Sequence, residues 1–402
     1  MQACGVNCAD QRTGPTPEAD RMRSYVLGAG MTRFTRQTER SAESLVVEAV
    51  RRALDDAGAD WNDVDAVFVG SFYLHQGLGQ RLLMQTPLLG KPVVNVENAC
   101  ASSGTAMREA LAWLEAGFCR TALAVGVETL TRMDSSGLGP PDEDLMGWFG
   151  GTFASSYALK ARRHIDAYGL RPEQLAAVTV KSRRHAQHNP LAHFREPTTV
   201  EAVLASPMIA DPLTRLQCCP NVDGAAAVLL GVDEVLPRFA APPLRVLASS
   251  MVSGRRRDHR DSEWDAVRRA AQAAYEQAGL GPSDLDLIEV HDACSIAEIT
   301  HCEDLGLCAA GEGGAYVAGG KATIGGGGVA VNPSGGLLSR GHPMGASGLA
   351  QIHELALQLR GRAGARQVAD ARTGLAHIMG GNVSELDSNA CLVHILQAAS
   401  PS

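Results

Sequence analysis

The stretch VVNVENACASSGTAMREALAWLEAG, residues 93–117, contains the transition that decides the fold. Its first six residues are mostly apolar and predict a short strand. From Ala106 onward the apolar side chains recur at helical spacing, which predicts a helix. Cys100 therefore lies at a turn between a strand and a helix, and we asked why a cysteine stands there.

A second copy of this turn lies near the other end of the chain. ASSGTAMREALAWLEAG, residues 101–117, aligns with GASGLAQIHELALQLRG, residues 345–361, and places Gly104 opposite Gly348. Each copy puts a small-residue turn at the beginning of a helix. Such self-similarity indicates a duplicated fold.

A weaker repeat agrees with the first one. RRALDDAGADWNDVDAVFVGS, from Arg51, resembles RRAAQAAYEQAGLGPSDLDLIEVHD, from Arg268. Each reads as a helix, an Ala-Gly stop, an acidic turn and a buried strand. We therefore expect an α/β protein of two similar halves, 22–240 and 241–402, divided near the proline-rich PRFAAPPLR at 237–245, with mainly parallel sheets covered by helices.

Two regions depart from this pattern. Residues 1–21 are polar, contain two prolines and lack an apolar core segment, which predicts a flexible tail rather than a signal peptide or membrane anchor. Between about 131 and 208 the alternation weakens into a Gly/Pro run, an aromatic stretch and basic helical segments. We expect an inserted lid there.

Composition excludes some classes of protein. The chain has 402 residues, is 45% hydrophobic and carries a net charge of −8, which predicts a soluble protein that does not bind nucleic acid. Its 10 cysteines are scattered, which is typical of a reducing cytoplasm. Their spacings do not match tetrahedral zinc sites, so no metal is expected.

The position of Cys100 suggests chemistry. A thiol at the first turn of a helix meets unpaired backbone N–H groups and the positive end of the helix dipole, so we expect a lowered pKa and a reactive thiolate. The small residues at 101–104 leave room for a ligand. The structural alternative is a small buried apolar side chain.

Polar residues at the equivalent turn supply partners for this thiol. NPSGGLLSRGHPMGASG holds Asn332 and His342 just before the matching helix. If the two helix starts face each other, Cys100 and His342 share one site as nucleophile and base. A third loop, EVHDACSIAEI, puts His291 and Asp292 at the end of a buried strand, where open α/β sheets bind ligands. A capping or core role is the alternative for each histidine.

These loops resemble those of the thiolase superfamily. NACASSG is similar to its nucleophile loop, SRGHPMGASG to its Gly-His-Pro loop, and VHDAC to a loop that reads His-Asp-Cys-Phe in one branch. The resemblance runs from about residue 23 to the C-terminus. It implies a duplicated five-layer αβαβα fold with two mixed sheets, and MIADPLT points to the branch of sterol-carrier-protein-like and archaeal thiolases.

The resemblance also implies roles for particular residues. Cys100 would attack an acyl thioester and hold the acyl group. His342 would activate Cys100 and help line an oxyanion hole. His291 would help bind a second thioester oxygen, and the N–H groups of Cys100 and Gly380 or Gly381 would stabilise the tetrahedral intermediate. Asn332 would belong to the same group of site loops.

Substrate contacts follow from the same resemblance. The enzyme would have no permanently bound cofactor and would take a coenzyme A or carrier thioester as substrate. The basic patches at Lys181 and Arg255 would contact coenzyme A, although each is also consistent with a solvated charged face. Apart from the resemblance, Trp148 and Phe149 stand beside glycines in the lid and are expected to contact substrate, with a core role as the alternative.

One departure from the family leaves the second half-reaction open. Classical thiolases carry a second catalytic cysteine in a Cys-x-Gly loop, and this chain reads HIMGGNVSELDSNACLVHIL instead. The His-Asp-Cys-Phe branch uses its loop cysteine, but here Ala293 occupies that place and Cys294 follows. Cys294 is thus a candidate acid/base, with a packing role as the alternative.

Three reactions remain open at this point. The acylated enzyme could make or break a carbon–carbon bond with an acyl-CoA, it could acylate an acceptor such as a phenolic ring, or the protein could be a retro-aldol lyase. The lyases of this superfamily typically lack the nucleophile, so Cys100 counts against the last. The resemblance also implies a homodimer and a small partner protein with a zinc ribbon and an OB-fold.

Overall fold

The computed structural model describes residues 23–73, 75–132, 145–256, 265–381 and 388–399. The tail expected at 1–21 lies outside this range.

The two halves of the chain arrange their strands in the same order. In sheet order the first half reads β3-β2-β4-β7-β1, and the second half reads β10-β9-β11-β12-β8. The bounds in the first half are β1 (Ser24–Met31), β2 (Ala66–Gly70), β3 (Val93–Val96), β4 (Thr121–Thr129) and β7 (Asp223–Val232). Those in the second are β8 (Leu244–Val252), β9 (Leu287–Glu289), β10 (Ala330–Val331), β11 (Thr373–Gly380) and β12 (Ala390–Ala398).

The pairing directions repeat as well. In each half the first three strands of the order are parallel, and the next two pairings are antiparallel. The halves are therefore mixed rather than mainly parallel. Strands β1 and β8 join them edge to edge, with Tyr25 opposite Arg245 and Val26 opposite Leu244. We propose that the chain divides between residues 240 and 241, in the connection that leads into β8.

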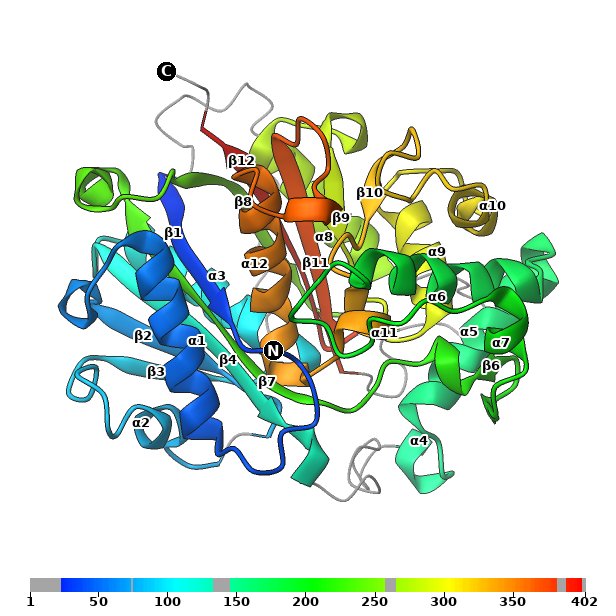
Figure 1. The fold of residues 1–402 in the computed structure, drawn as a ribbon, viewed down its shortest axis with the longest axis horizontal. Coiled ribbons are helices and arrows are strands. Elements are labelled where there is room, and N and C mark those ends of the chain that lie inside the picture. Colours follow the sequence, from blue (N-terminus) through cyan, green and yellow to red (C-terminus); the bar gives the residue numbers. More distant parts are fainter. Residues whose placement is uncertain (1–22, 74, 133–144, 257–264, 382–387, 400–402) are drawn as a thin grey trace, which may run out of the picture.

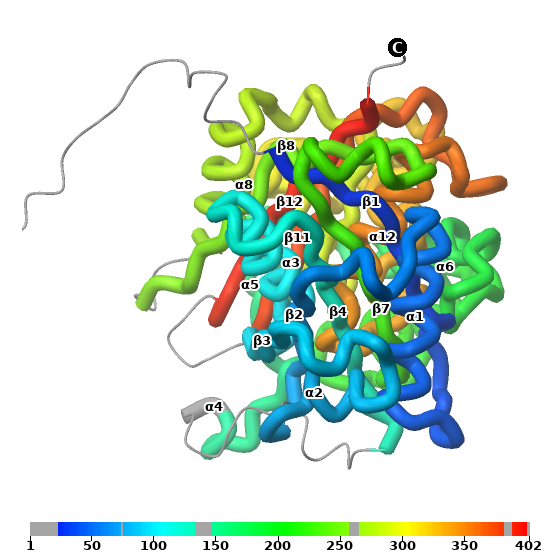
Figure 2. Tube along the Cα trace, turned by 90° about the vertical axis from the view of Figure 1, so that its left-hand side faces the viewer, coloured from blue at the N-terminus to red at the C-terminus, as the bar shows by residue number. Residues whose placement is uncertain are grey.

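Helices form the three remaining layers (Figures 1 and 2). Helix α1 (Ala42–Ala57) packs on the outside of the first sheet, where α2 (Leu78–Leu82) also lies. Helices α3 (Ser102–Glu115) and α12 (Ser347–Leu359) lie between the two halves, and α8 (Asp265–Ala278) and α9 (Ser295–Asp304) cover the outside of the second. The five-layer arrangement expected from the sequence is confirmed.

The two central helices touch at the glycines that the internal alignment paired. A Cβ atom on Gly348 would lie 2.8 Å from the backbone nitrogen of Gly104. A larger residue at this crossing would push α3 and α12 apart. Because both helix starts carry site loops, this close approach brings the two halves of the site together.

The insertion from the first half lies over the second half. Its described elements are α4 (Leu145–Trp148), α5 (Phe153–Tyr168), α6 (Pro172–Ala186), α7 (Val200–Leu204), β5 (Met208–Ala210) and β6 (Leu213–Thr214). Helices α5 and α6 pack against α9, and α6 also contacts α10 (Gly313–Ala318) and α11 (Gly336–Arg340). The predicted lid region therefore bridges the halves, although its residues 133–144 fall outside the described part.

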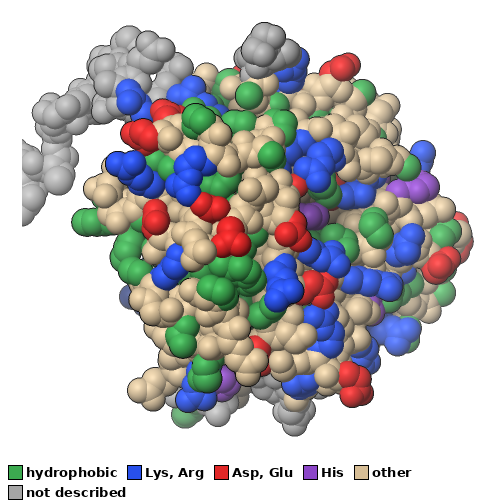
Figure 3. All heavy atoms as spheres, turned by 60° about the vertical axis from the view of Figure 1, so that its left-hand side comes forward, with side chains coloured by type: hydrophobic (Ala, Val, Ile, Leu, Met, Phe, Trp, Pro, Cys, Tyr) green, Lys and Arg blue, Asp and Glu red, His purple; other side chains and the backbone are tan. Residues whose placement is uncertain are grey.

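Charge is spread over the surface. On the face shown in Figure 3, acidic and basic side chains are interspersed around small apolar patches. None of the helices in the described residues is long and apolar enough to cross a membrane.

Candidate active site

Cys100 lies in a strained turn between β3 and α3. It is the middle residue of the short 3-10 helix Ala99–Ala101. Ala99 has a φ of 50°, a left-handed conformation that costs a non-glycine residue free energy. The turn is held by the Ala99 N–H, which donates to Glu97 Oε1 at 2.6 Å, and by the Asn98 N–H, which donates to Ser102 Oγ at 3.0 Å. These bonds fix the backbone that presents the thiol.

Three predicted residues meet at this turn. Cys100 Sγ and one ring nitrogen from each of His291 and His342 all lie within 4.8 Å of one another. The two imidazole rings are edge to face, with centroids 5.1 Å apart and an interplanar angle of 82°. Both histidines are buried, and Cys100 is half-buried. Two loops of the second half thus converge on a thiol from the first half.

Hydrogen bonds define the tautomer of His342. Its Nδ1 lies 2.7 Å from Ser347 Oγ, and the Ser347 hydroxyl donates to the Pro343 carbonyl at 3.0 Å. The hydroxyl can then only accept from His342, so Nδ1 carries the proton. The opposite nitrogen, Nε2, is buried and has no hydrogen-bond partner in the described part of the protein. Burial holds the pKa of His342 well below its usual range, so the ring is neutral with a free lone pair.

The thiol of Cys100 differs from the sequence expectation. Burial raises the pKa of Cys100 to about 12, whereas the helix-start position predicted a lowered pKa. The Gly381 N–H donates to the sulfur and lowers the pKa, but desolvation is the larger effect. Cys100 therefore stays protonated at neutral pH, and it needs a neighbouring base to become a nucleophile.

The glycines after β11 lie against the nucleophile turn. Gly381 has a φ of 68° and points its N–H at Cys100 Sγ. A Cβ atom on Gly380 would lie 1.9 Å from the Asn98 carbonyl oxygen, so only glycine permits this approach. Of the two predicted candidates, Gly381 therefore provides the N–H beside the reacting sulfur.

The loop that carries His291 is tied to the Gly-His-Pro loop by its neighbour. Asp292 is fully buried, and its Oδ1 accepts the Leu337 N–H at 2.6 Å, at the start of α11. The His291 N–H donates to His377 Nδ1 at 3.5 Å. Burial lowers the pKa of His291 to about 3, so this ring is also neutral. Its Nδ1 is buried without a hydrogen-bond partner among the described residues.

Glu128 connects two further loops and was not singled out from the sequence. It accepts N–H bonds from Phe72 at 2.7 Å and Gly345 at 3.2 Å, and a hydroxyl bond from Ser71 at 3.2 Å. Burial raises its pKa to about 7. Because Gly345 lies three residues after His342, Glu128 helps to fix the loop that carries the base.

Asn332 lies near the site without facing it. Its side-chain oxygen accepts the Val290 N–H at 2.8 Å, and its nitrogen donates to Glu298 at 2.8 Å. Both amide groups are therefore engaged in holding the end of β9. Asn332 positions the loop of His291 rather than contacting the cluster.

The structure buries one of the two predicted basic contacts and exposes the other. The ammonium group of Lys181 is buried, 2.8 Å from Glu298 Oε1 and 2.6 Å from the Val331 carbonyl oxygen. It pairs an internal carboxylate and is not open to a ligand, so we withdraw it as a coenzyme A contact. The side chain of Arg255 is 71% exposed and lies 3.7 Å from Asp265. It belongs to a charged surface.

The lid aromatics are exposed on the inserted segment. Trp148 is 79% exposed and Phe149 is 86% exposed. Neither is packed in the core. Their contact with substrate remains a prediction.

Cys294 pairs with a second thiol. Its thiol donates to Cys218 Sγ at 3.6 Å. Tyr157 of α5 was not predicted from the sequence. Burial is the largest cause of its raised pKa, and the nearby Cys294 and Cys100 raise the pKa further. Cys219 is likewise within electrostatic reach of Cys100. The insertion thus contributes a phenol, and the segment that follows it contributes two thiols.

Some of these missed residues carried a usable signal. Ser347 stands five residues after His342, inside the quoted helix-start motif, and a serine there is a natural partner for the ring. Glu128 and Tyr157 gave no local signal, because their roles depend on contacts between distant segments.

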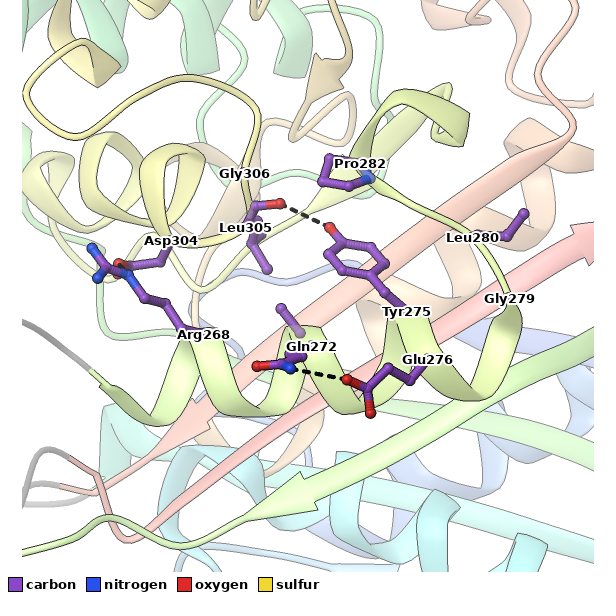
Figure 4. Close-up of a pocket in the computed structure, with 11 residues that line it drawn as sticks. Arg268, Gln272, Tyr275, Glu276, Gly279, Leu280, Pro282, Asp304, Leu305 and Gly306 are labelled. Carbon is purple, nitrogen blue, oxygen red and sulfur yellow. Dashed lines mark hydrogen bonds and ion pairs between the residues drawn. The ribbon is translucent and has the colours of Figure 1, made fainter. Parts of the chain in front are cut away.

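A surface groove elsewhere does not belong to this site. It lies between α8 and α9 (Figure 4), where Tyr275 Oη donates to the Leu305 carbonyl and Arg268 pairs with Asp304. Its lining includes no residue of the cluster. Cys100, His291 and His342 offer the sulfur and nitrogen donors found in zinc sites. Among the described residues, they form the one group of three or more possible metal ligands that lie close together.

Comparison with known proteins decides the family. Residues 24–234 match the family described as "Thiolase, N-terminal domain", and residues 249–393 match "Thiolase C-terminal domain-like". The chain is 40% identical over 367 residues to an acetyl-CoA acetyltransferase of Methanothermobacter thermautotrophicus, covering 89% of this chain and 96% of that protein. The chain belongs to the thiolase family.

Other relatives agree with the expected branch. A sterol carrier protein 2 of Gallus gallus is 36% identical over 394 residues, covering 92% of this chain and 72% of that protein. Among solved structures, one named "Ltp2-ChsH2(DUF35) aldolase" has a TM-score of 0.82 at 26% identity, covering 95% of this chain and 99% of that chain. The expectation of a thiolase-family acyltransferase is confirmed.

Proposed function

We propose that the protein forms an acyl-enzyme at Cys100 from an acyl-CoA thioester and then makes or breaks a carbon–carbon bond. One observation carries the first step: His342, whose Nε2 lone pair is free, brings a ring nitrogen within 4.8 Å of a protonated thiol that also receives the Gly381 N–H. A base, a nucleophile and an oxyanion donor in one place are the requirements of acyl transfer.

The half-reaction follows from these positions. His342 Nε2 takes the Cys100 proton while Sγ attacks the thioester carbonyl carbon. The carbonyl oxygen becomes an oxyanion, which the N–H groups of Cys100 and Gly381 stabilise. When the tetrahedral intermediate collapses, the carbon–sulfur bond of the thioester breaks, and the departing thiolate takes the proton from His342. The acyl group remains on Cys100.

The identity of the donor is supported by the relatives. The Methanothermobacter protein is named an acetyl-CoA acetyltransferase, which makes coenzyme A thioesters the first choice of substrate for this chain. The reaction proposed above needs no permanently bound cofactor, since thiol and imidazole carry each proton and bond change.

For the second half-reaction we propose Cys294 as the acid/base at the α-carbon of the incoming acyl thioester. Tyr157 interacts electrostatically with both Cys294 and Cys100, which supports a shared site. The hydrogen bond to Cys218, followed by burial, raises the pKa of Cys294, so it is a proton donor at rest and a strong base once deprotonated. The segment aligned with the Cys-x-Gly loop includes residues 382–387, which lie outside the described part. Transfer to a phenolic acceptor is the alternative that needs no such base.

A lyase function is the second candidate, because the solved neighbour named above is an aldolase. That reaction would make the Cys100 nucleophile superfluous. The paired arrangement of Cys100 and His342 therefore favours the transferase.

Two kinds of assembly are proposed. Strand β3 ends the sheet order and pairs with β2 alone among the described strands, and its four residues are half-buried, so its open edge suits a homodimer contact. The structural neighbour with a DUF35 component supports a small zinc-ribbon/OB-fold partner. The eight described cysteines are free thiols, which fits a reducing cytoplasm.

The test of this proposal is release of coenzyme A from a panel of acyl-CoAs, with and without a second acyl-CoA as acceptor. We expect donor-dependent release that Cys100→Ser abolishes and a carbon–carbon product when the acceptor is present. Retro-aldol cleavage that persists in Cys100→Ser would contradict the transferase and support the lyase.

A further inference from the structure

Cys218 and Cys294 face each other across two short segments. Cys218 follows the 3-10 helix Arg215–Gln217, and Cys294 is the N-cap of α9. The two residues form an isolated antiparallel bridge, and the Cys219 N–H donates to the Ala293 carbonyl at 2.9 Å. That bond joins the residues flanking the pair, so Cys218 and Cys294 occupy a non-hydrogen-bonded position.

This position suits a disulfide. Residues paired in this way have Cα atoms about 4.5 Å apart, and their side chains approach most closely. Disulfides accept Cα separations from about 4.4 Å to 6.8 Å. The two sulfurs are already 3.6 Å apart. Closing the bond requires side-chain rotation and a small approach, without a rearranged backbone.

The two thiols are not equivalent. Cys218 is half-buried and accepts the S–H of Cys294, which lowers the pKa of Cys218. Cys294 is only 4% exposed. A reachable thiol of lowered pKa beside a buried second thiol is the arrangement of a sensing and a resolving cysteine.

We propose that Cys218 and Cys294 form a reversible regulatory disulfide in response to a peroxide. The Cys218 thiolate attacks one peroxide oxygen, the O–O bond breaks, and a sulfenic acid and one water form after proton uptake. The Cys294 sulfur then attacks the sulfenic sulfur, loses its proton and expels the hydroxyl as a second water. Two electrons pass from the two sulfurs to the peroxide, and a dithiol reverses the step by exchange.

The consequence for activity rests on the proposed function. The disulfide would occupy the Cys294 sulfur while leaving Cys100, His342 and Gly381 in place. Oxidised enzyme would therefore still accept an acyl group on Cys100 but would lose proton exchange at the α-carbon. The switch would act on the second half-reaction alone.

The experiment is a hydrogen peroxide titration of the full-length protein, read by intact mass and by non-reducing peptide mapping. Cys219→Ser is the matched control, because Cys219 is the adjacent thiol and is not bridged to Cys294. We expect wild type and Cys219→Ser to lose the mass of two hydrogen atoms, to yield a peptide linking Cys218 to Cys294, and to regain the mass with dithiothreitol. Cys218→Ser should yield no linked peptide.

Other results would overturn the proposal. A linked peptide through Cys219, or oxidation of Cys218 to sulfenic or sulfinic acid without a link, would show that the bridge does not form. Measurement of α-proton exchange distinguishes the disulfide proposal from the proposed acid/base role of Cys294. A linked Cys218–Cys294 protein that still exchanges the α-proton keeps the disulfide, contradicts its regulatory role and removes Cys294 as the acid/base.

Discussion

His342 Nδ1 lies 2.7 Å from Ser347 Oγ, and this contact leaves Nε2 as the ring nitrogen that is free to act on the Cys100 thiol. Because burial raises the pKa of Cys100 to about 12, the thiol is protonated at neutral pH and depends on that lone pair. The nucleophile is thus activated on demand by a base, rather than kept as a thiolate by the helix start. General-base catalysis of this kind typically contributes a rate factor of about 100 to 10,000.

Removal of the base should slow acylation by about the rate factor that general-base catalysis contributes. We expect His342→Ala to acylate Cys100 about 100 to 10,000 times more slowly than wild type. Ser347→Ala should lose less, because the ring remains but its tautomer is no longer fixed. Rapid-quench intact mass spectrometry measures both rates, with the exposed His188→Gln as control. Equal rates in His342→Ala and wild type would assign His342 to packing.

Buried neutral histidines should make the fold sensitive to acid. Burial lowers the pKa values of His291, His301, His342 and His377 in the folded state. The unfolded chain therefore binds protons that the folded chain does not, as pH falls below the ordinary histidine value of about 6.5. We expect the contribution of these histidines to the free energy of unfolding to be constant above that pH and to fall below it.

A single substitution measures this effect. Both ring nitrogens of His301 lack a hydrogen-bond partner in the described part of the chain. His301→Leu should reduce the slope of unfolding free energy against pH by up to about 1.4 kcal/mol per pH unit, the limit for one proton that is reached below the ordinary histidine pKa. Urea unfolding between pH 5 and 7, roughly spanning the ordinary histidine pKa, provides the slopes. His188→Gln, on the surface, should leave the slope unchanged, and an unchanged slope in His301→Leu would refute this account.

Loss of Lys181 should affect stability and not substrate binding. Lys181→Met leaves the buried Glu298 without its ammonium partner, and breaking such a pair costs about 3–5 kcal/mol. The KM for an acyl-CoA should be unchanged below the unfolding temperature. Arg184→Met, on the exposed face of the same helix, is the control and should change neither quantity. A raised KM in Lys181→Met with unchanged stability would restore its role as a coenzyme A contact.

Glu128 should prove to be a positioning residue. In Glu128→Ala the backbone N–H groups of Phe72 and Gly345, which both donate to Glu128 Oε2, lose their acceptor. An unsatisfied buried group costs about 1–3 kcal/mol, and the loop after His342 should shift. We expect a lower kcat with a nearly unchanged KM. A change confined to thermal stability would limit Glu128 to a structural role.

The sequence allowed the fold and the centre of the site to be predicted because their signals are local and repeated. The alignment of Gly104 with Gly348 pointed to the place where α3 and α12 approach each other, because a duplicated fold brings equivalent turns to its axis. In the structure a Cβ added to Gly348 would lie 2.8 Å from the Gly104 backbone nitrogen. The turn motifs at Cys100 and His342 converge for the same reason.

Other features could not be predicted because they depend on long-range packing. The pKa of Cys100 is set by desolvation from both halves, which a helix-start rule does not contain. The basic run at Lys181 reads as a solvated face or a ligand contact until its partner Glu298 is known. The bridge between Cys218 and Cys294 joins segments 76 residues apart.

The most direct test of the central claim is the site of acylation. The protein is incubated briefly with an acyl-CoA, quenched in acid, and analysed by intact mass and peptide mapping, beside Cys100→Ala. The account predicts a gain of one acyl group on the peptide that contains Cys100, and no gain in the variant. An acyl group on Cys219 or Cys294, or an equal gain in Cys100→Ala, would contradict it.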